Sequence, residues 1–306
     1  MSRKIKGEIC LIFVAFFWGS SYILMKLGLK TFSEPNIIAL RFLGAFFLLS
    51  PYLILKRKNI KLKTVLKSAA LGAALFGVFI LILMGLKSTS ASNVAFLQST
   101  YIFLVPFELA FINKKMPKLK VFLSVLLCLF GLWFMNSDGS LKLGRGEILT
   151  LFSAVFYSFH ILLTQKYVKS EDPVAIGIMQ LFFAGAFALF PAVSQGGFHL
   201  PKTGEEFLII ILLAIFSSAF GFVGQTVSQR YVPAEICSVI ISTEPLFSAL
   251  FGVIILKEIL SGESIFGMLL LFSGAVISTV EFDFFAPLIM KIKNKTARFR
   301  KKNGRF

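Results

Sequence analysis

Three ionisable side chains lie well inside long apolar stretches of the sequence: Arg41, His160 and Glu244. A charged side chain at the centre of a membrane-spanning helix costs roughly 2.5–3.5 kcal/mol on insertion scales, so such residues usually face a polar cavity or a partner. Arg41 could bind a carboxylate through two parallel N–H groups. Glu244 could bind an amine or carry a proton, and His160 could relay one. A zwitterion held between Arg41 and Glu244 is the sharpest hypothesis that these residues suggest.

Each of these residues also has a purely structural interpretation. Arg41 could form an ion pair or extend towards the membrane interface. His160 could be a satisfied helix contact. Glu244 stands beside Pro245, which removes a backbone donor and can loosen a helix, so a neutral, hydrogen-bonded carboxyl at a hinge is the alternative there.

Uncharged polar residues extend the candidate site. Residues 98–101 form a polar run that includes Gln98 and Tyr101, and its apolar surroundings favour a cavity wall. Gln180 occupies the position in the second half of the chain that Arg41 occupies in the first. Interhelical hydrogen bonding is the alternative for such groups, at roughly 0.6 kcal/mol each. The predicted substrate-binding set is Trp18, Arg41, Gln98, Tyr101, His160, Gln180 and Glu244.

The composition places these residues in a membrane protein. The chain is 57% hydrophobic and 15% charged, whereas soluble domains are about 45–50% apolar and about 25% charged. The cysteines Cys10, Cys128 and Cys237 lack metal-ligand spacing. Neither a metal nor a cofactor is predicted. An intramembrane enzyme would need a metal cluster, a Ser/His pair or paired Asp residues within the spans, and these are not found, so we expect no catalytic residues.

Hydropathy and the residues at helix boundaries predict an all-α integral membrane protein of ten transmembrane helices. Each stretch is close to the roughly 20 residues that cross the hydrocarbon core, and helices satisfy their own backbone groups there. Ser33-Glu34-Pro35, Thr89-Ser90-Ala91-Ser92-Asn93 and Glu171-Asp172-Pro173 mark helix starts. The predicted helices cover residues 7–30, 34–56, 65–86, 91–112, 118–136, 146–168, 173–193, 205–229, 235–256 and 263–282.

Charge predicts the orientation of these helices. With the N-terminus inside, 24 of the 32 Lys and Arg residues fall on the inner side and 7 on the outer side, with Arg41 left within a span. This bias follows the positive-inside rule and predicts a multi-pass protein of the plasma (inner) membrane with both termini cytoplasmic. It also explains the net charge of +17 without a nucleic-acid partner; the predicted surroundings are a lipid bilayer.

An internal repeat divides the chain. Gly7-Glu8-Ile9 recurs as Gly146-Glu147-Ile148, Trp18 is matched by Tyr157, and Ser99-Thr100 recurs as Ser242-Thr243. The predicted units are a five-helix repeat at residues 1–137, a second at 146–282, and a basic cytoplasmic tail at 283–306. Because five is odd, the second copy is inverted, which is an architecture of alternating-access transporters with a site near the membrane midplane.

The motifs, in this order and spacing, resemble the drug/metabolite transporter superfamily and its EamA-type branch. They are Trp18-Gly19-Ser20-Ser21, Arg41-Phe42, residues 89–93, Ser242-Thr243-Glu244-Pro245 and Lys257-Glu258. The resemblance covers about residues 7–282 and implies export of metabolites, often amino acids. The first repeat departs from the second, with Tyr101-Ile102 in place of Glu244-Pro245, so the acidic-proline element belongs to one half only.

The sequence therefore predicts a secondary transporter, an exporter of small metabolites such as amino acids, that works by alternating access. Its partners are a small-molecule substrate and, as a coupling ion, the proton. The alternatives are a carrier of larger nucleotide-linked or lipid-like substrates and a non-transporting membrane scaffold. The solute, the direction, the coupling and the oligomeric state stay open at this point.

Overall fold

The computed structural model describes residues 1–56, 60–135, 144–256 and 261–279, and these residues contain helices and no strands. Lys257-Glu258 and the tail 283–306 lie outside them. Eight helical stretches are long and apolar enough to cross a membrane, and two shorter apolar helices accompany them. The helices are α1 (Arg3–Gly28), α2 (Glu34–Lys56), α3 (Leu62–Ser88), α4 (Ala91–Gln98), α5 (Tyr101–Asn113), α6 (Leu119–Met135), α7 (Arg145–Tyr167), α8 (Pro173–Ser194), α9 (Gly204–Leu212), α10 (Gly221–Ser228), α11 (Ala234–Ile241), α12 (Glu244–Leu256) and α13 (Gly262–Thr279).

The predicted helix starts are confirmed and have a local cause. Ser90 caps α4, since its side chain accepts a hydrogen bond from the backbone N–H of Asn93. Asp172 caps α8 by accepting from the N–H of Val174, and Pro173 occupies the first turn. A side-chain acceptor satisfies a backbone donor that the first turn leaves free, and proline has no such donor to lose there.

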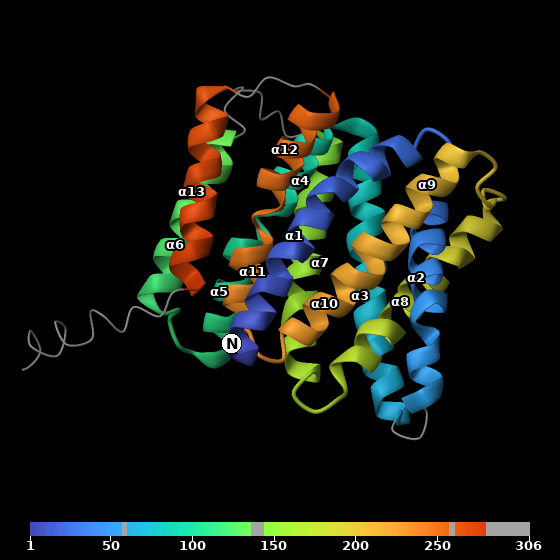
Figure 1. Ribbon diagram of the computed structural model, residues 1–306, viewed down its shortest axis with the longest axis horizontal. Coiled ribbons are helices and arrows are strands. Elements are labelled where there is room, and N and C mark those ends of the chain that lie inside the picture. Colours follow the sequence, from blue (N-terminus) through green and yellow to red (C-terminus); the bar gives the residue numbers. More distant parts are fainter. Residues whose placement is uncertain (57–59, 136–143, 257–260, 280–306) are drawn as a thin grey trace, which may run out of the picture.

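The helices pack as one bundle with a separate pair at its side (Figure 1). In the bundle α2 packs on α8, α3 packs on α7 and α8, and α1 packs on α10 and α12. The short helices α6 and α13 pack on each other, and a second, small apolar core joins this pair to the bundle through Ile102 of α5 and Val239 of α11. The main core lies along α1, α2, α3, α7 and α8.

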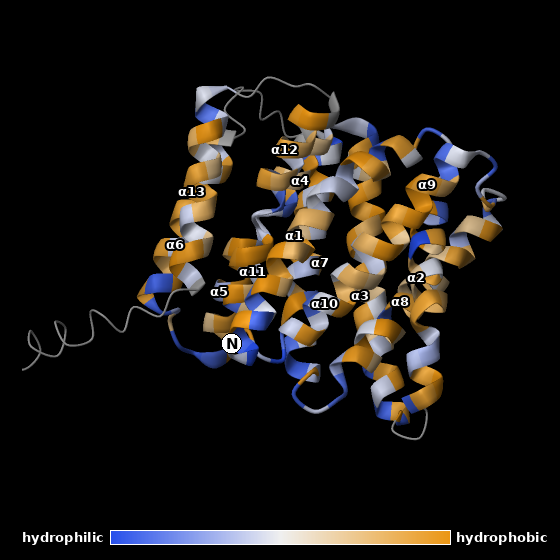
Figure 2. Cartoon of the chain, in the orientation of Figure 1, coloured by the Kyte–Doolittle hydropathy of each residue, from blue (hydrophilic) through white to orange (hydrophobic). Residues whose placement is uncertain are grey.

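The outside of the bundle is apolar. Figure 2 shows hydrophobic residues along the helices and hydrophilic ones gathered at the helix ends and in the loops. Large aromatic side chains point outward in several helices; Phe47, Phe152 and Phe190 are among the most exposed. A water-soluble protein would not present such a continuous apolar surface, whereas a lipid bilayer accommodates it.

Two predicted helices, 91–112 and 235–256, are wrong as continuous helices, because each is broken near its middle. Turns at Ser99-Thr100 and Ser242-Thr243 separate α4 from α5 and α11 from α12. In both turns the hydroxyls donate to carbonyls of the preceding helical turn: Ser99 to Ala95 and Thr100 to Leu97, Ser242 to Val239 and Thr243 to Ile240. Hydroxyls that take helix carbonyls bend or end a helix. The recurring Ser-Thr pair is therefore a recurring helix break.

The predicted helix 205–229 also departs from a regular α-helix. Between α9 and α10 the chain forms a π-helical segment, Leu213–Phe220. A π-helix widens the turn and releases carbonyls from the i to i−4 pattern, and such segments are frequent at functional sites. Here it lies beside α1 and α2, where it supplies the hydrogen-bond partners described below.

The crossing of α1 and α12 gives a test of the fold. A Cβ added at Gly19 would lie 2.8 Å from the Glu244 carbonyl oxygen and 2.9 Å from the Ser248 backbone nitrogen, so the two helices would have to separate. We expect Gly19→Ala to destabilise the protein by about 1–3 kcal/mol and to lower its melting temperature in detergent.

Gly204→Ala is the matched control, because a Cβ at Gly204 meets nothing within 4 Å. It should leave the melting temperature unchanged or raise it slightly. Equal melting temperatures for the two variants would contradict the close crossing of α1 and α12.

Candidate functional site

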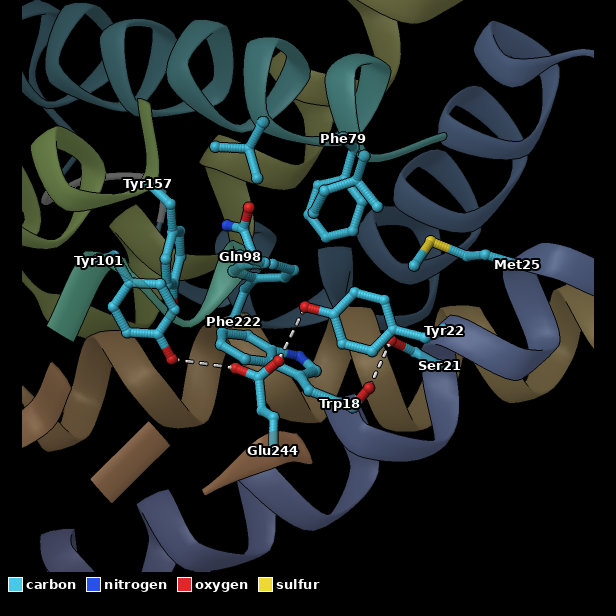
Figure 3. A pocket seen from close by; sticks show the side chains of 12 residues that line it. Trp18, Ser21, Tyr22, Met25, Phe79, Gln98, Tyr101, Tyr157, Phe222 and Glu244 are labelled. Carbon is cyan, nitrogen blue, oxygen red and sulfur yellow. Dashed lines mark hydrogen bonds between the residues drawn. The ribbon is translucent and has the colours of Figure 1, made fainter. Parts of the chain in front are cut away.

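A small pocket lies at the centre of the bundle, between the broken helices and the face of α1 (Figure 3). Its volume is about 20 Å³, roughly what one water molecule needs. Most of its wall is aromatic. The lining residues are Trp18, Ser21, Tyr22, Met25, Val78, Phe79, Ile82, Gln98, Tyr101, Tyr157, Phe222 and Glu244.

Glu244 supplies the pocket's carboxylate. It is the first residue of α12, directly after the Ser242-Thr243 break, and only 3% of it is exposed. Tyr22 donates to Oε2 at 3.1 Å and Tyr101 donates to Oε1 at 3.3 Å. The first turn of a helix also favours a negative charge, since its free N–H groups point outward. The break, the helix terminus and two tyrosines together accommodate a carboxylate inside an apolar bundle.

One face of α1 forms a wall of the pocket. Trp18, Ser21, Tyr22 and Met25 follow one another at helical spacing and line it together. The Trp18 indole Nε1 donates to the Ser217 carbonyl at 2.7 Å, and Ser217 belongs to the π-helical segment. The widened helix thus fixes the tryptophan ring.

Gln98 and Tyr101 flank the first helix break and reach the pocket from either side of it. The Tyr101 ring meets the Tyr157 ring edge-on, with centroids 4.8 Å apart. Tyr157 in turn meets Trp18 at 5.9 Å. The Gln98 side-chain oxygen is buried and has no hydrogen-bond partner within the described ranges. It is a free acceptor at the pocket.

Arg41 lies one layer behind the pocket and is fully buried. Its Nε donates to Ser218 Oγ at 2.9 Å and its Nη1 contacts Met25 Sδ at 3.2 Å. The guanidinium lies over the Phe79 ring, 4.5 Å from its centroid. Met25 and Phe79 both line the pocket, so these two side chains separate the arginine from it.

His160 and Gln180 also lie behind the pocket and are fully buried. His160 Nε2 donates to Gln180 Oε1 at 2.8 Å, and Gln180 Nε2 donates to Thr226 Oγ1 at 3.0 Å. The His160 ring stacks against the Tyr157 ring, with an interplanar angle of 11°. The two predicted residues are therefore partners of each other, and they support the pocket's aromatic wall from behind.

The predicted set thus divides into two shells. Trp18, Gln98, Tyr101 and Glu244 line the pocket, while Arg41, His160 and Gln180 are buried behind it. Sequence reasoning missed Tyr22, Met25, Phe79 and Phe222. Tyr22 and Met25 had a signal, because they lie four and seven residues after Trp18 on one helix face. Nothing in the sequence distinguished Phe79 and Phe222 from the other phenylalanines, of which the chain has 37 in all.

Polar contacts hold the helices together at both ends of α3. At its start, Lys67 and Thr64 bind the Glu171 carboxylate, with the Lys67 ion pair at 2.5 Å. At its end, Lys87 pairs with Glu34 at 2.7 Å. No group of three His, Cys, Asp or Glu side chains in the described part of the chain could hold a metal ion.

Comparison with known proteins identifies the family of the chain. The family model described as the EamA-like transporter family matches twice, at residues 5–137 and 144–280. The chain belongs to the EamA-like transporter family. Its apolar helices and this membership make it a multi-pass membrane transporter.

Two relatives of this EamA-like chain match most of its length, and a third matches about half of it. An uncharacterized transporter of Archaeoglobus fulgidus is 27% identical over 90% of this chain and 86% of its own. The uncharacterized transporter YwfM of Bacillus subtilis is 26% identical over 89% of this chain and 94% of its own. The threonine/homoserine exporter RhtA of Salmonella typhimurium is 25% identical over 52% of this chain and 54% of its own.

A solved crystal structure shares the fold of the EamA-like chain. It has a TM-score of 0.74 and 14% sequence identity, and the match covers 90% of this chain and 96% of the other. At this identity the match shows the arrangement of the helices alone. The chemistry of the pocket has to be argued from the residues that line it.

The Glu171 cluster gives a pH-dependent prediction for the EamA-like protein. Hydrogen bonds from Lys67 and then Thr64 lower the pKa of Glu171 below its usual value. A lowered folded-state pKa stabilises the protein above the unfolded pKa, and this stabilisation is lost as the pH falls through the folded value. Glu171→Gln should therefore cost about 1 kcal/mol or less at pH 7 and nothing at low pH.

Melting temperatures of the wild type and Glu171→Gln in detergent, measured from pH 7 down to about pH 3, test this. The two curves should converge as the pH falls. A difference that stays constant with pH would mean that the Glu171 charge does not contribute.

Proposed function

We propose that this protein is a secondary carrier that exports a small amine-bearing metabolite, such as an amino acid, and that Glu244 binds the amine. The observation that carries the proposal is a buried carboxylate facing a central pocket at a helix break, with two tyrosine hydroxyls as its hydrogen-bond donors. Burying a carboxylate in a membrane protein is energetically unfavourable, and such residues are typically retained where they bind a ligand or a proton.

The rest of the pocket also favours a positively charged group. Among the described residues that line the pocket, Glu244 is the one with a carboxylate, and none is Lys or Arg. The aromatic rings of Trp18, Tyr22 and Tyr101 line the pocket together with Glu244. The faces of aromatic rings attract ammonium groups. The free Gln98 oxygen adds an acceptor. The relative named as a threonine/homoserine exporter supports an amino-acid substrate class.

We further propose that the two halves, residues 1–137 and 146–282, are inverted five-helix repeats among ten spans. The double match of the family model supports this division, and so do the breaks at Ser99-Thr100 and Ser242-Thr243. The pocket draws residues from both halves, including Trp18 and Glu244. Rocking of one half against the other would open it to either side in turn.

The charge bias supports a location in the plasma membrane with both termini cytoplasmic, because 24 of the 32 Lys and Arg residues then lie inside. Glu244 can hold either a proton or the substrate amine, so exchange of one for the other would couple export to the proton gradient.

Release of solutes from proteoliposomes tests the proposal. Vesicles loaded with a mixture of amino acids should release a subset of them through the wild type, followed by mass spectrometry with and without a pH gradient. Glu244→Gln should reduce this release by about tenfold or more, because an amide cannot balance the ammonium charge.

Glu108→Gln is the matched control. Glu108 is a half-buried carboxylate that accepts a hydrogen bond from Ser158 and does not line the pocket. It should release solutes at close to the wild-type rate. Full activity in Glu244→Gln, or equal loss in both variants, would refute the role of Glu244.

A further inference from the structure

The buried arginine behind the pocket is not paired with any carboxylate in the part of the chain that the structure describes. Arg41 is fully buried. Among the described residues, its Nη2 has no hydrogen-bond partner. A buried guanidinium normally has an anion that satisfies its fork of donors. Arg41 therefore keeps guanidinium donors that the described residues do not satisfy.

The contacts of Arg41 leave the right pair of donors for a carboxylate. Ser218 holds Nε on one side at 2.9 Å. Nη1 and Nη2 remain, and the one polar contact they make with the described residues is to the Met25 thioether, 3.2 Å from Nη1. Sulfur of this type is a weak acceptor, whereas a carboxylate accepts two parallel N–H bonds from one guanidinium. A carboxylate would displace the thioether.

Met25 is also a side chain that can move aside. It lines the pocket (Figure 3), and its sulfur also contacts Arg41 Nη1. Methionine has three rotatable bonds and adapts its shape readily. A pocket of about 20 Å³ has to enlarge for any solute larger than water, and rotation of Met25 enlarges it towards Arg41.

We propose that Arg41 binds the carboxylate of the transported solute, and that rotation of the Met25 side chain, which separates Arg41 from the pocket, opens this subsite. The inference rests on the proposed role of Glu244 at the pocket's other side. The bound solute is then an amino acid in its zwitterionic form, with its amine at Glu244 and its carboxylate at Arg41. The arginine comes from the first half of the chain and the glutamate from the second, so the solute bridges the halves.

Amino acids and their amides form the matched probes, because an amide keeps the amine and the size but removes the negative charge. Proteoliposomes are loaded with L-threonine and L-threoninamide, and likewise with leucine and phenylalanine and their amides, and leakage from protein-free vesicles is subtracted. The wild type should release the acid of the preferred pair at least about tenfold faster than its amide. Arg41→Gln should abolish this preference by slowing the acid alone.

Two further variants separate the possible outcomes. Met25→Ala removes the side chain that separates Arg41 from the pocket. It should lower the half-saturating concentration of the acid by about threefold or more, with no change for the amide. Glu244→Gln should slow both members of a pair. Equal release of acid and amide by the wild type, equal loss of both in Arg41→Gln, or an unchanged Met25→Ala would overturn the Arg41 subsite while Glu244 keeps its role. Release of neither member by the wild type would overturn the proposed function as well.

Discussion

A carboxylate enclosed by an apolar helix bundle has to receive its hydrogen-bond donors from that bundle, and much of this structure meets that requirement at Glu244. The Ser242-Thr243 break ends α11 early and places Glu244 in the first turn of α12. Tyr22 and Tyr101 then reach it from α1 and from the other broken span. The close approach of α1 at Gly19 brings these groups together. Without the break, the same residue would lie within a continuous helix, away from the helix N-terminus that favours a negative charge.

The polar residues behind the pocket hold its aromatic wall and leave the volume small. Trp18 is fixed by the Ser217 carbonyl of the π-helical segment, and the same segment supplies Ser218 to Arg41. His160 and Gln180 form a chain with Thr226 behind Tyr157 and Phe222. Ion pairs hold both ends of α3, and in this conformation the pocket beside Glu244 has a volume of about 20 Å³. Space for a solute has to come from movement of side chains such as Met25, or of the helices.

The sequence predicted the helical membrane fold, because apolar stretches of spanning length and their caps are local features. It also predicted that Glu244, Trp18, Gln98 and Tyr101 share a cavity, since an ionisable residue within a span has few alternatives. It did not predict the helix breaks, although the repeated Ser-Thr pair that causes them was visible. The placement of Arg41 behind Met25, and the pairing of His160 with Gln180, depend on how helices distant in sequence pack. No local pattern encodes that packing, and propensity alone does not reveal a π-helical segment.

The central claim is that the pocket beside Glu244 faces each side of the membrane in turn. Ser21 lines this pocket and is 4% exposed, so Ser21→Cys in a variant whose three native cysteines are replaced reports its accessibility. A membrane-impermeant thiol reagent added to inside-out or to right-side-out vesicles should label Cys at position 21 from both sides, and a transported solute should slow the labelling. Ser124→Cys, buried in the α6–α13 pair, should stay unlabelled. Labelling of the pocket cysteine from one side only, or from neither, would contradict the account.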